Sequence, residues 1–367
     1  MKTTLAPLPG LFALALALAP AATAQDGPAP EAPAGPAAPA APAAAGLELT
    51  ATLAAPKVAV GELARVVVRL RNAGAAATEA LELAEDRAVV SFDVKQDDGR
   101  VFEWSKLHPG PENPRADWPR KQLEPGAQLE LEVPFPALAA GKFTITARYR
   151  RNAEGAALAA APVVLEVTPA GNGGTEVEVV MTTSHGPLRL RLFPKEALGT
   201  CLHFARLVLA GGEVDGRRGP GFYDGTKFHR VIPGFMIQGG DPAGNGTGGP
   251  GYGIPAEFAT RPFPETLKHV PGRLSMARSQ HEDSAGSQFF VCVGAPSSLD
   301  GNYTCFGEVT RGLDVAYSIA DVPCRSTEGM DERSTPLEPV TLHTVRIVPR
   351  KPAPAPPQAP APGGGGQ

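Results

Sequence analysis

One short block of the sequence gathers the residue types that a peptide-binding groove requires. Within nine positions it places a guanidinium at Arg230, two large apolar side chains at Phe235 and Met236, and a carboxamide at Gln238. An apolar floor beside a cation and an amide suits the binding of a proline ring with its flanking backbone. The block therefore predicts a groove that binds a proline-containing segment.

Further segments in the same order resemble one known family, the cyclophilin-type peptidyl-prolyl cis-trans isomerases. The matching segments are Phe222–Val231, Phe228–Pro242, Asn245–Gly249, Gly272–Arg278, Ser287–Phe290, Leu299–Gly301 and Phe306–Gly307. Together they extend over roughly residues 176–349, nearly half of the chain. The resemblance implies an enzyme that needs no cofactor and no metal, with proline-containing polypeptides as substrates.

The reaction that the resemblance implies is rotation about an X-Pro peptide bond. The barrier is about 18–20 kcal/mol, so the uncatalysed rotation takes tens of seconds. A rate gain of roughly 10⁴ requires about 5.5 kcal/mol. No covalent bond breaks, so a pocket that favours the twisted amide over both planar forms suffices.

The resemblance implies three catalytic residues, which are Arg230, Phe235 and Gln238. A twisted amide loses resonance and its prolyl nitrogen becomes basic, so the Arg230 guanidinium stabilises that state selectively. A charged hydrogen bond of this kind contributes about 1.5–3 kcal/mol. The apolar cup for the proline ring is expected from Phe235 and Met236 together with Phe290 and Leu299.

Ten further residues are implied in substrate binding: His229, Met236, Gly246, Ala277, Arg278, Ser279, Gln288, Phe290, Leu299 and Tyr303. For His229, structural support is an equally open role. Strand alternation predicts that Gln288, Phe290 and Cys292 share one face. The opposite face, with Phe289, Val291 and Val293, is then expected in the barrel core.

Two positions depart from the family pattern. Ser298 stands where many eukaryotic cyclophilins carry a tryptophan that packs on cyclosporin, so weak inhibition by cyclosporin is expected. Tyr303 replaces the histidine that is common at its position. A phenol still packs on a proline ring and donates a hydrogen bond, so activity is expected to survive both changes.

The first 24 residues have the features of an export signal. Lys2 is followed by an apolar run at Leu11–Ala19, and Ala22–Ala24 fits a small-x-small cleavage site that leaves Gln25 first. The apolar run is shorter than the about 20 residues that span a bilayer, so we expect no membrane insertion after cleavage. The alternative to a cleaved signal peptide is an uncleaved membrane anchor. With cleavage, the expected location of the protein is the periplasm or the cell exterior.

An oxidising compartment permits disulfides among the four cysteines: Cys201, Cys292, Cys305 and Cys324. Cys201 lies in a helical pattern and Cys292 in an apolar strand, which favours small core residues over disulfide partners. No Cys-x-x-Cys pair occurs, so neither a redox motif nor a zinc site is supported.

Composition divides the chain into six predicted segments. They are a signal peptide (1–24), an Ala/Pro-rich disordered linker (25–46), a first domain (47–169), a hinge (170–175), a cyclophilin-like domain (176–349) and a Pro/Gly-rich disordered tail (350–367). The net charge of −4 excludes the basic footprint of a nucleic-acid-binding protein.

The whole chain is predicted to be mainly β. Short alternating runs such as Leu47–Leu53, separated by turn residues, indicate a β-sandwich in the first domain. This domain is similar to exported immunoglobulin-like modules, without their paired cysteines. Glu103–Arg120 is expected to be a long loop whose Trp104 and Trp118 seal the sandwich edges or form a binding patch. For the second domain, the resemblance implies a closed eight-stranded barrel capped by two helices.

Two function hypotheses follow. The first is an exported peptidyl-prolyl isomerase that assists protein folding, and the second is a proline-peptide binding module or chaperone in which catalysis is incidental. The intact set of Arg230, Phe235, Gln238 and Phe290 favours the enzyme. The first domain is expected to capture clients or to contact an envelope partner, which raises the local substrate concentration.

Overall fold

The computed structural model describes residues 46–83, 89–97, 99, 101–104, 118–151, 157–209, 212–214, 217–219, 221–258, 267–326 and 332–351. The predicted signal peptide, nearly all of the predicted linker and the tail beyond Lys351 lie outside these residues. Within these ranges, no helix is long and apolar enough to cross a membrane.

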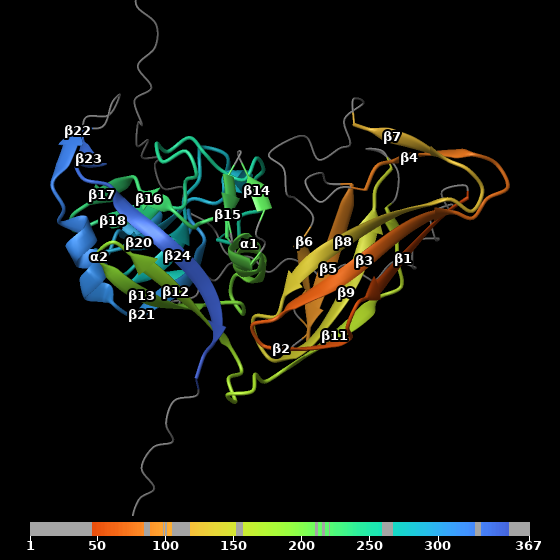
Figure 1. Cartoon of the computed structure of the whole chain (residues 1–367), viewed down its shortest axis with the longest axis horizontal. Helices are drawn as coiled ribbons and strands as arrows, with labels where there is room; N and C mark the ends of the chain where they lie inside the picture. The colour runs from red at the N-terminus through yellow and green to blue at the C-terminus, as the bar shows by residue number, and fades with distance from the viewer. Residues whose placement is uncertain are drawn as a thin grey trace, which may run out of the picture. The chain divides into compact units, whose positions relative to one another are not determined.

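Residues 47–168 form two larger β-sheets and one strand pair (Figure 1). The first sheet is antiparallel, in the order β1 (Leu47–Leu53), β3 (Leu63–Asn72) and β8 (Gln128–Pro136). The second sheet runs β2 (Lys57–Ala59), β11 (Val163–Thr168), β9 (Gly141–Tyr149), β5 (Val90–Gln96) and β6 (Val101–Trp104), and β10 (Leu158–Ala159) pairs with β9. The separate pair is β4 (Thr78–Leu81) with β7 (Arg120–Leu123).

Alternation along these strands buries one face of each sheet. In β1, Leu47 and Leu49 are buried while Glu48 and Thr50 are exposed. The rings of Phe135 on β8 and Phe143 on β9 meet edge-on, with centroids 5.8 Å apart, so the two sheets pack face to face.

The predicted loop Glu103–Arg120 is shorter than expected, because its first two residues belong to β6 and its last residue begins β7. Trp118 is partly buried and packs against the core, in agreement with an edge-sealing role. The side chain of Trp104 lies outside the described residues.

Residues 177–349 form a nine-stranded sheet that curls into a nearly closed barrel (Figure 1). Its order is β16 (Thr226–Phe228), β24 (Val340–Pro349), β12 (Val177–Thr183), β13 (Gly186–Leu192), β21 (Cys305–Arg311), β19 (Arg273–Met276), β20 (Phe289–Cys292), β18 (Met236–Gly239) and β17 (Arg230–Ile232).

The prediction of eight strands is wrong, because the barrel sheet has nine. The same feature of the chain explains the extra strand and the near closure of the barrel. β16 and β17 lie at opposite ends of the strand order, yet His229 alone separates them along the chain. Before His229 the backbone pairs with β24, and after it with β18. One continuous run of chain therefore provides two strands and brings the sheet edges together.

Two helices accompany the barrel, as predicted: α1 (Leu198–Leu209) and α2 (Leu313–Ala320). The Phe204 ring of α1 reaches the barrel aromatics, with centroids 5.0 Å from Tyr223 and 5.3 Å from Phe306. The Glu257 carboxylate accepts hydrogen bonds from the backbone N–H groups of Gly199 and Thr200 and therefore caps α1.

Short elements outside the barrel sheet complete this part of the chain. They are the hairpins β14 (Gly212–Val214) with β15 (Arg217–Gly219) and β22 (Cys324–Ser326) with β23 (Arg333–Pro336), and the 3₁₀ turns η2 (Glu282–Ser284) and η3 (Ser297–Leu299).

All four cysteines are free in the structure. Cys201, Cys292 and Cys305 are buried, and burial raises the pKa of the Cys292 and Cys305 thiols to about 12. A thiol with so high a pKa is unreactive at neutral pH, which agrees with the interpretation of Cys201 and Cys292 as core residues.

Candidate active site

Strand register brings the predicted catalytic residues onto one wall of the barrel. In the β17–β18 hairpin, Arg230 lies directly opposite Gln238. In the next ladder, β18 with β20, Gln238 lies opposite Phe290 and Met236 lies opposite Cys292. Directly opposed residues point to the same face of a sheet, so cation, amide and apolar side chains share one surface.

The apolar side chains of this surface form a cluster separate from the barrel core. Met236, Phe290 and Cys292 are buried at its centre, and Ile232, Phe235, Ala277, Leu299 and Tyr303 pack around them. The Phe290 and Tyr303 rings meet edge-on, with centroids 5.9 Å apart.

The predicted alternation along β20 is confirmed by this division. Phe290 and Cys292 belong to the separate cluster, while Phe289, Val291 and Val293 belong to the main core. The four residues predicted to form the proline cup all lie in the separate cluster, which we call the apolar pocket.

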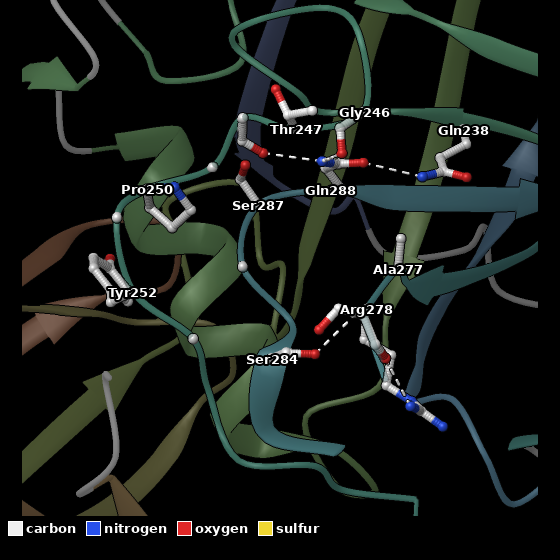
Figure 2. Close-up of a pocket in the computed structure, with 16 residues that line it drawn as sticks. Gln238, Gly246, Thr247, Pro250, Tyr252, Ala277, Arg278, Ser284, Ser287 and Gln288 are labelled. Carbon is white, nitrogen blue, oxygen red and sulfur yellow. Dashed lines mark hydrogen bonds between the residues drawn. The ribbon is translucent and has the colours of Figure 1, made fainter. Parts of the chain in front are cut away.

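A chain of hydrogen bonds runs along the polar edge of the apolar pocket. Arg230 Nη1 lies 3.5 Å from Gln238 Oε1, at the limit for a hydrogen bond, and Gln238 Nε2 donates to Gln288 Oε1 at 3.0 Å. Gln288 Nε2 donates in turn to the carbonyls of Gly246 (3.0 Å) and Gly248 (2.9 Å). Figure 2 shows the Gln288 carboxamide between Gln238 and the loop that carries Gly246.

Next to this chain lies a cavity of about 420 Å³. Its lining residues are Gln238, 246–253, 277–279, Ser284 and 286–288 (Figure 2). Six of the predicted site residues therefore line the cavity: Gln238, Gly246, Ala277, Arg278, Ser279 and Gln288. A volume of this size accommodates one or two amino-acid residues of a bound peptide.

Arg278 connects the cavity wall to the apolar pocket. Its Nε donates to the Asn302 carbonyl at 2.9 Å, and its Nη1 donates to the Ser279 carbonyl at 2.9 Å. The guanidinium also lies over the Tyr303 ring, 4.7 Å from the centroid. Arg278 thus holds the phenol that replaces the more common histidine.

His229 lies beneath the loop that borders the cavity, since a Cβ atom at Gly246 would lie 3.9 Å from His229 Nε2. Burial lowers the pKa of His229, and the Arg230 charge acts in the same direction. A partly buried, neutral imidazole therefore lies next to the loop. Both of its ring nitrogens are buried without a hydrogen-bond partner in the described parts of the chain.

Asp241 is a supporting residue that sequence reasoning missed. Its buried carboxylate accepts hydrogen bonds from the backbone N–H groups of Ala243, Asn245 and Gly246. Burial by itself would raise the pKa of Asp241, but these three donors hold it below the usual value. Its position directly after Gly239 and Gly240 was the available signal, because a carboxylate there can close a turn.

A second missed group lies behind Phe290. The His269 ring stacks on Phe290 at 5.8 Å, with Nδ1 2.8 Å from Asp300 Oδ1 and Nε2 3.1 Å from Ser275 Oγ. This order of serine, histidine and carboxylate resembles a hydrolase triad. Ser275 is fully buried, so its hydroxyl meets no substrate and the group is a support for Phe290.

A carboxylate that no sequence pattern indicated, Glu332, lies against Arg230. It binds the Arg230 guanidinium through both oxygens, at 2.6 Å and 3.0 Å. In the described parts of the chain, no group of three or more histidine, cysteine or acidic side chains is placed to hold a metal ion.

Comparison with known proteins agrees with this geometry. Residues 178–347 match the family described as cyclophilin type peptidyl-prolyl cis-trans isomerase/CLD. A peptidyl-prolyl cis-trans isomerase of Synechococcus elongatus is 44% identical over 144 residues, which cover 39% of this chain and 88% of that protein. The chain belongs to the cyclophilin-type peptidyl-prolyl cis-trans isomerases.

Two further cyclophilins illustrate how far the similarity extends. Peptidyl-prolyl cis-trans isomerase B of Bacillus subtilis is 44% identical over 134 residues, covering 36% of this chain and 83% of the relative. A cyclophilin of Cryptosporidium parvum, solved in the presence of the dipeptide Ala-Pro, is 29% identical, with a TM-score of 0.39, and covers 47% of this chain and 98% of that chain.

The cyclophilin part of the chain thus carries the isomerase activity, and all of the predicted site residues lie within it. The structure gathers them into three adjoining groups: the apolar pocket, the chain of hydrogen bonds and the cavity. His229 lies just beneath them.

Proposed function

We propose that this cyclophilin isomerises X-Pro bonds of exported polypeptides in the groove formed by the apolar pocket and the cavity, with Arg230 as the catalytic cation. The observation that carries the assignment of the groove is the register that sets Arg230 opposite Gln238 at the edge of the pocket. A peptide here has an apolar seat for the ring within reach of one guanidinium.

In the proposed mechanism the proline ring occupies the apolar pocket against Phe235, Met236 and Phe290. The residues before the proline lie toward the cavity, where Gln238 and Gln288 offer amides to the peptide backbone. As the amide twists, its nitrogen becomes a hydrogen-bond acceptor for Arg230. This bond forms fully in the twisted state alone, so it lowers the barrier without tightening ground-state binding.

The assay that tests the groove compares the full chain with Arg230→Ala. We expect a fall in kcat/KM of roughly 10- to 150-fold, because a charged hydrogen bond of about 1.5–3 kcal/mol is lost. Arg189→Ala is the matched control, since Arg189 pairs with Glu178 on the barrel surface. A protease-coupled assay of an X-Pro peptide measures the rate, and full activity in Arg230→Ala contradicts the assignment.

Export is proposed from the sequence alone, on the charged, apolar and small-residue segments that precede Gln25. Fractionation of cells that produce the protein, followed by mass determination of its first peptide, tests this. A chain that begins at Gln25 in the exported fraction supports the proposal. A chain that keeps Leu11–Ala19 in the membrane fraction supports the uncleaved anchor instead.

For the first domain we propose an immunoglobulin-like module that recruits clients or an envelope partner. Support comes from the two face-to-face sheets of residues 47–168 and the absence of any predicted catalytic residue among them. The test is the refolding rate of a protein whose folding is limited by proline isomerisation. Equal rates with the full chain and with residues 176–349 contradict client capture.

A further inference from the structure

Arg230 is held from the side by a carboxylate that lies 102 residues further along the chain. Glu332 Oε1 accepts a hydrogen bond from Arg230 Nε at 2.6 Å, and Oε2 accepts one from Nη2 at 3.0 Å. This is the two-pronged geometry in which a carboxylate fixes both the plane and the direction of a guanidinium.

Glu332 is itself held in place. Ser334 is fully buried, and its hydroxyl donates to Glu332 Oε1 at 2.7 Å. Ser334 belongs to β23 of the β22–β23 hairpin, and Glu332 directly precedes this strand, which lies beside β17. The hairpin is outside the barrel sheet, so it forms a side support for the strand that carries Arg230.

The Nη1 group of Arg230 lies on the side of Gln238. With Nε and Nη2 bound to the carboxylate, Nη1 is directed to Gln238, the first amide of the chain that continues to Gln288. A free arginine side chain has many rotamers, and ordering it during catalysis costs conformational entropy. The carboxylate removes that cost before the substrate binds.

We propose that Glu332 is a positioning residue for catalysis, which orients the Arg230 guanidinium toward the twisted amide. The proposal rests on the proposed role of Arg230. Glu332 is ionised at neutral pH, because the hydrogen bonds from Arg230 hold its pKa below the usual value. The side chains of both partners are about 29% exposed, so the pair is reachable by water and contributes orientation more than stability.

The test compares Glu332→Ala and Glu332→Gln in the full chain. We expect kcat/KM to fall about 3- to 30-fold in Glu332→Ala, since small displacements of a catalytic group reduce the rate steeply. The affinity for a proline-containing peptide, measured by calorimetry, stays within about twofold, because the pocket is unchanged. Glu332→Gln keeps one acceptor oxygen and restores part of the rate.

Two controls separate positioning from general stability. Glu178→Ala removes a comparable partner from Arg189 on the barrel surface, and it leaves kcat/KM unchanged. In the Arg230→Ala background, Glu332→Ala has no further effect on the rate, because the group that it orients is absent.

Three results overturn the proposal. One is an unchanged or higher kcat/KM in Glu332→Ala, which makes the pair neutral or inhibitory. Another is that Glu332→Ala lowers the rate by the same factor in the unaltered chain and in Arg230→Ala. The third is that Glu332→Ala lowers the melting temperature and that this instability accounts for the loss of rate. Full activity in Arg230→Ala would contradict the proposed catalytic role of Arg230. If Arg230→Ala loses activity but Glu332→Ala keeps it, only the positioning role of Glu332 is contradicted.

Discussion

At the residue scale, we expect Ser298 to limit the ligands that the proposed groove binds without affecting its chemistry. It lies in η3, next to Leu299 of the apolar pocket, and its side chain is exposed. The hydroxymethyl group offers little apolar area to a large cyclic peptide. The side chains proposed to be catalytic are elsewhere: Arg230 on β17, Gln238 on β18 and Phe235 in the turn between these strands.

We predict that Ser298→Trp strengthens inhibition by cyclosporin about tenfold or more. A buried large side chain contributes on the order of 1.5–3 kcal/mol, and each 1.4 kcal/mol is a factor of ten in affinity. Inhibition constants of both proteins measure the effect, and kcat/KM with a short X-Pro peptide serves as the control. Nanomolar inhibition of the unaltered chain would show that the pocket does not need the indole.

The residues of the site differ in role: some are proposed to contact the substrate, and others hold those residues in place. Arg230, Gln238 and Phe290 share one face of the barrel sheet, whereas Asp241 binds the backbone of the cavity loop and His269 stacks behind the Phe290 ring. The sequence resemblance pointed to the first set because those residues belong to the matched segments. The supporting residues are recognisable only by their contacts.

At the scale of elements, α1 depends on a carboxylate from outside the helix. Both Glu257 oxygens accept hydrogen bonds from the first turn, and Thr200 Oγ1 adds a third donor at 2.6 Å. Burial raises the pKa of Glu257, although the Thr200 and Gly199 donors act in the opposite direction. The cap therefore joins the segment after the cavity loop to the helix that packs on the barrel.

We predict that Glu257→Ala destabilises the cyclophilin part by about 1–2 kcal/mol, the usual cost of losing a helix N-cap. For a domain of this size the melting temperature falls by about 2–8 °C. Glu257→Gln keeps an acceptor oxygen and loses less. Scanning calorimetry measures the melting temperatures of the unaltered chain, Glu257→Gln and Glu257→Ala, which we expect to decrease in that order. Equal melting temperatures would show that water caps the first turn of α1 equally well.

At the scale of the whole molecule, buried histidines link stability to pH. His203 of α1 is 1% exposed, its Nε2 donates to the Gly286 carbonyl at 2.8 Å, and its Nδ1 has no partner in the described parts of the chain. Burial lowers its pKa from 6.5 to about 4. The folded state therefore keeps this imidazole neutral at a pH where the unfolded chain protonates it.

The lowered pKa of His203 makes the folded state less stable at acidic pH. Above pH 6.5 the imidazole is neutral in both states, so there is no penalty. As the pH falls from 6.5 toward 4, the unfolded chain gains a proton that the folded protein does not, and up to about 3 kcal/mol of stability is lost. Calorimetry at pH 7.5 and 4.5 measures this loss.

His203→Gln is the matched variant, because its amide keeps a donor for Gly286 and does not titrate. We expect it to lose less stability than the unaltered chain between the two pH values, whatever its stability at pH 7.5. His229 and His269 also have lowered pKa values, so a smaller acid sensitivity remains. An identical loss in both proteins would assign the pH dependence to groups other than His203.

Much of the site followed from the sequence, because its parts are encoded close together. Arg230 and Gln238 face each other across a short hairpin, and the alternation in 288–293 divides pocket from core. Side-chain type and strand period are local properties, so the division of β20 between the apolar pocket and the core was predictable. The isomerase activity was predictable from the family segments. Short strands without an alternating pattern, such as β2 and β10, were not predicted. They are strands only because they pair with β11 and β9 in the folded chain.

The tertiary structure alone decided the closure of the barrel and the restraint on its arginine. The switch of pairing partner at His229 depends on β24, which comes from a distant part of the chain, whereas β18 follows β17 in a local hairpin. The contact of Glu332 with Arg230 depends in the same way on a hairpin folded beside β17. Neither contact has a period or a motif in the sequence, because hydrogen bonds between distant segments exist only after the chain has folded.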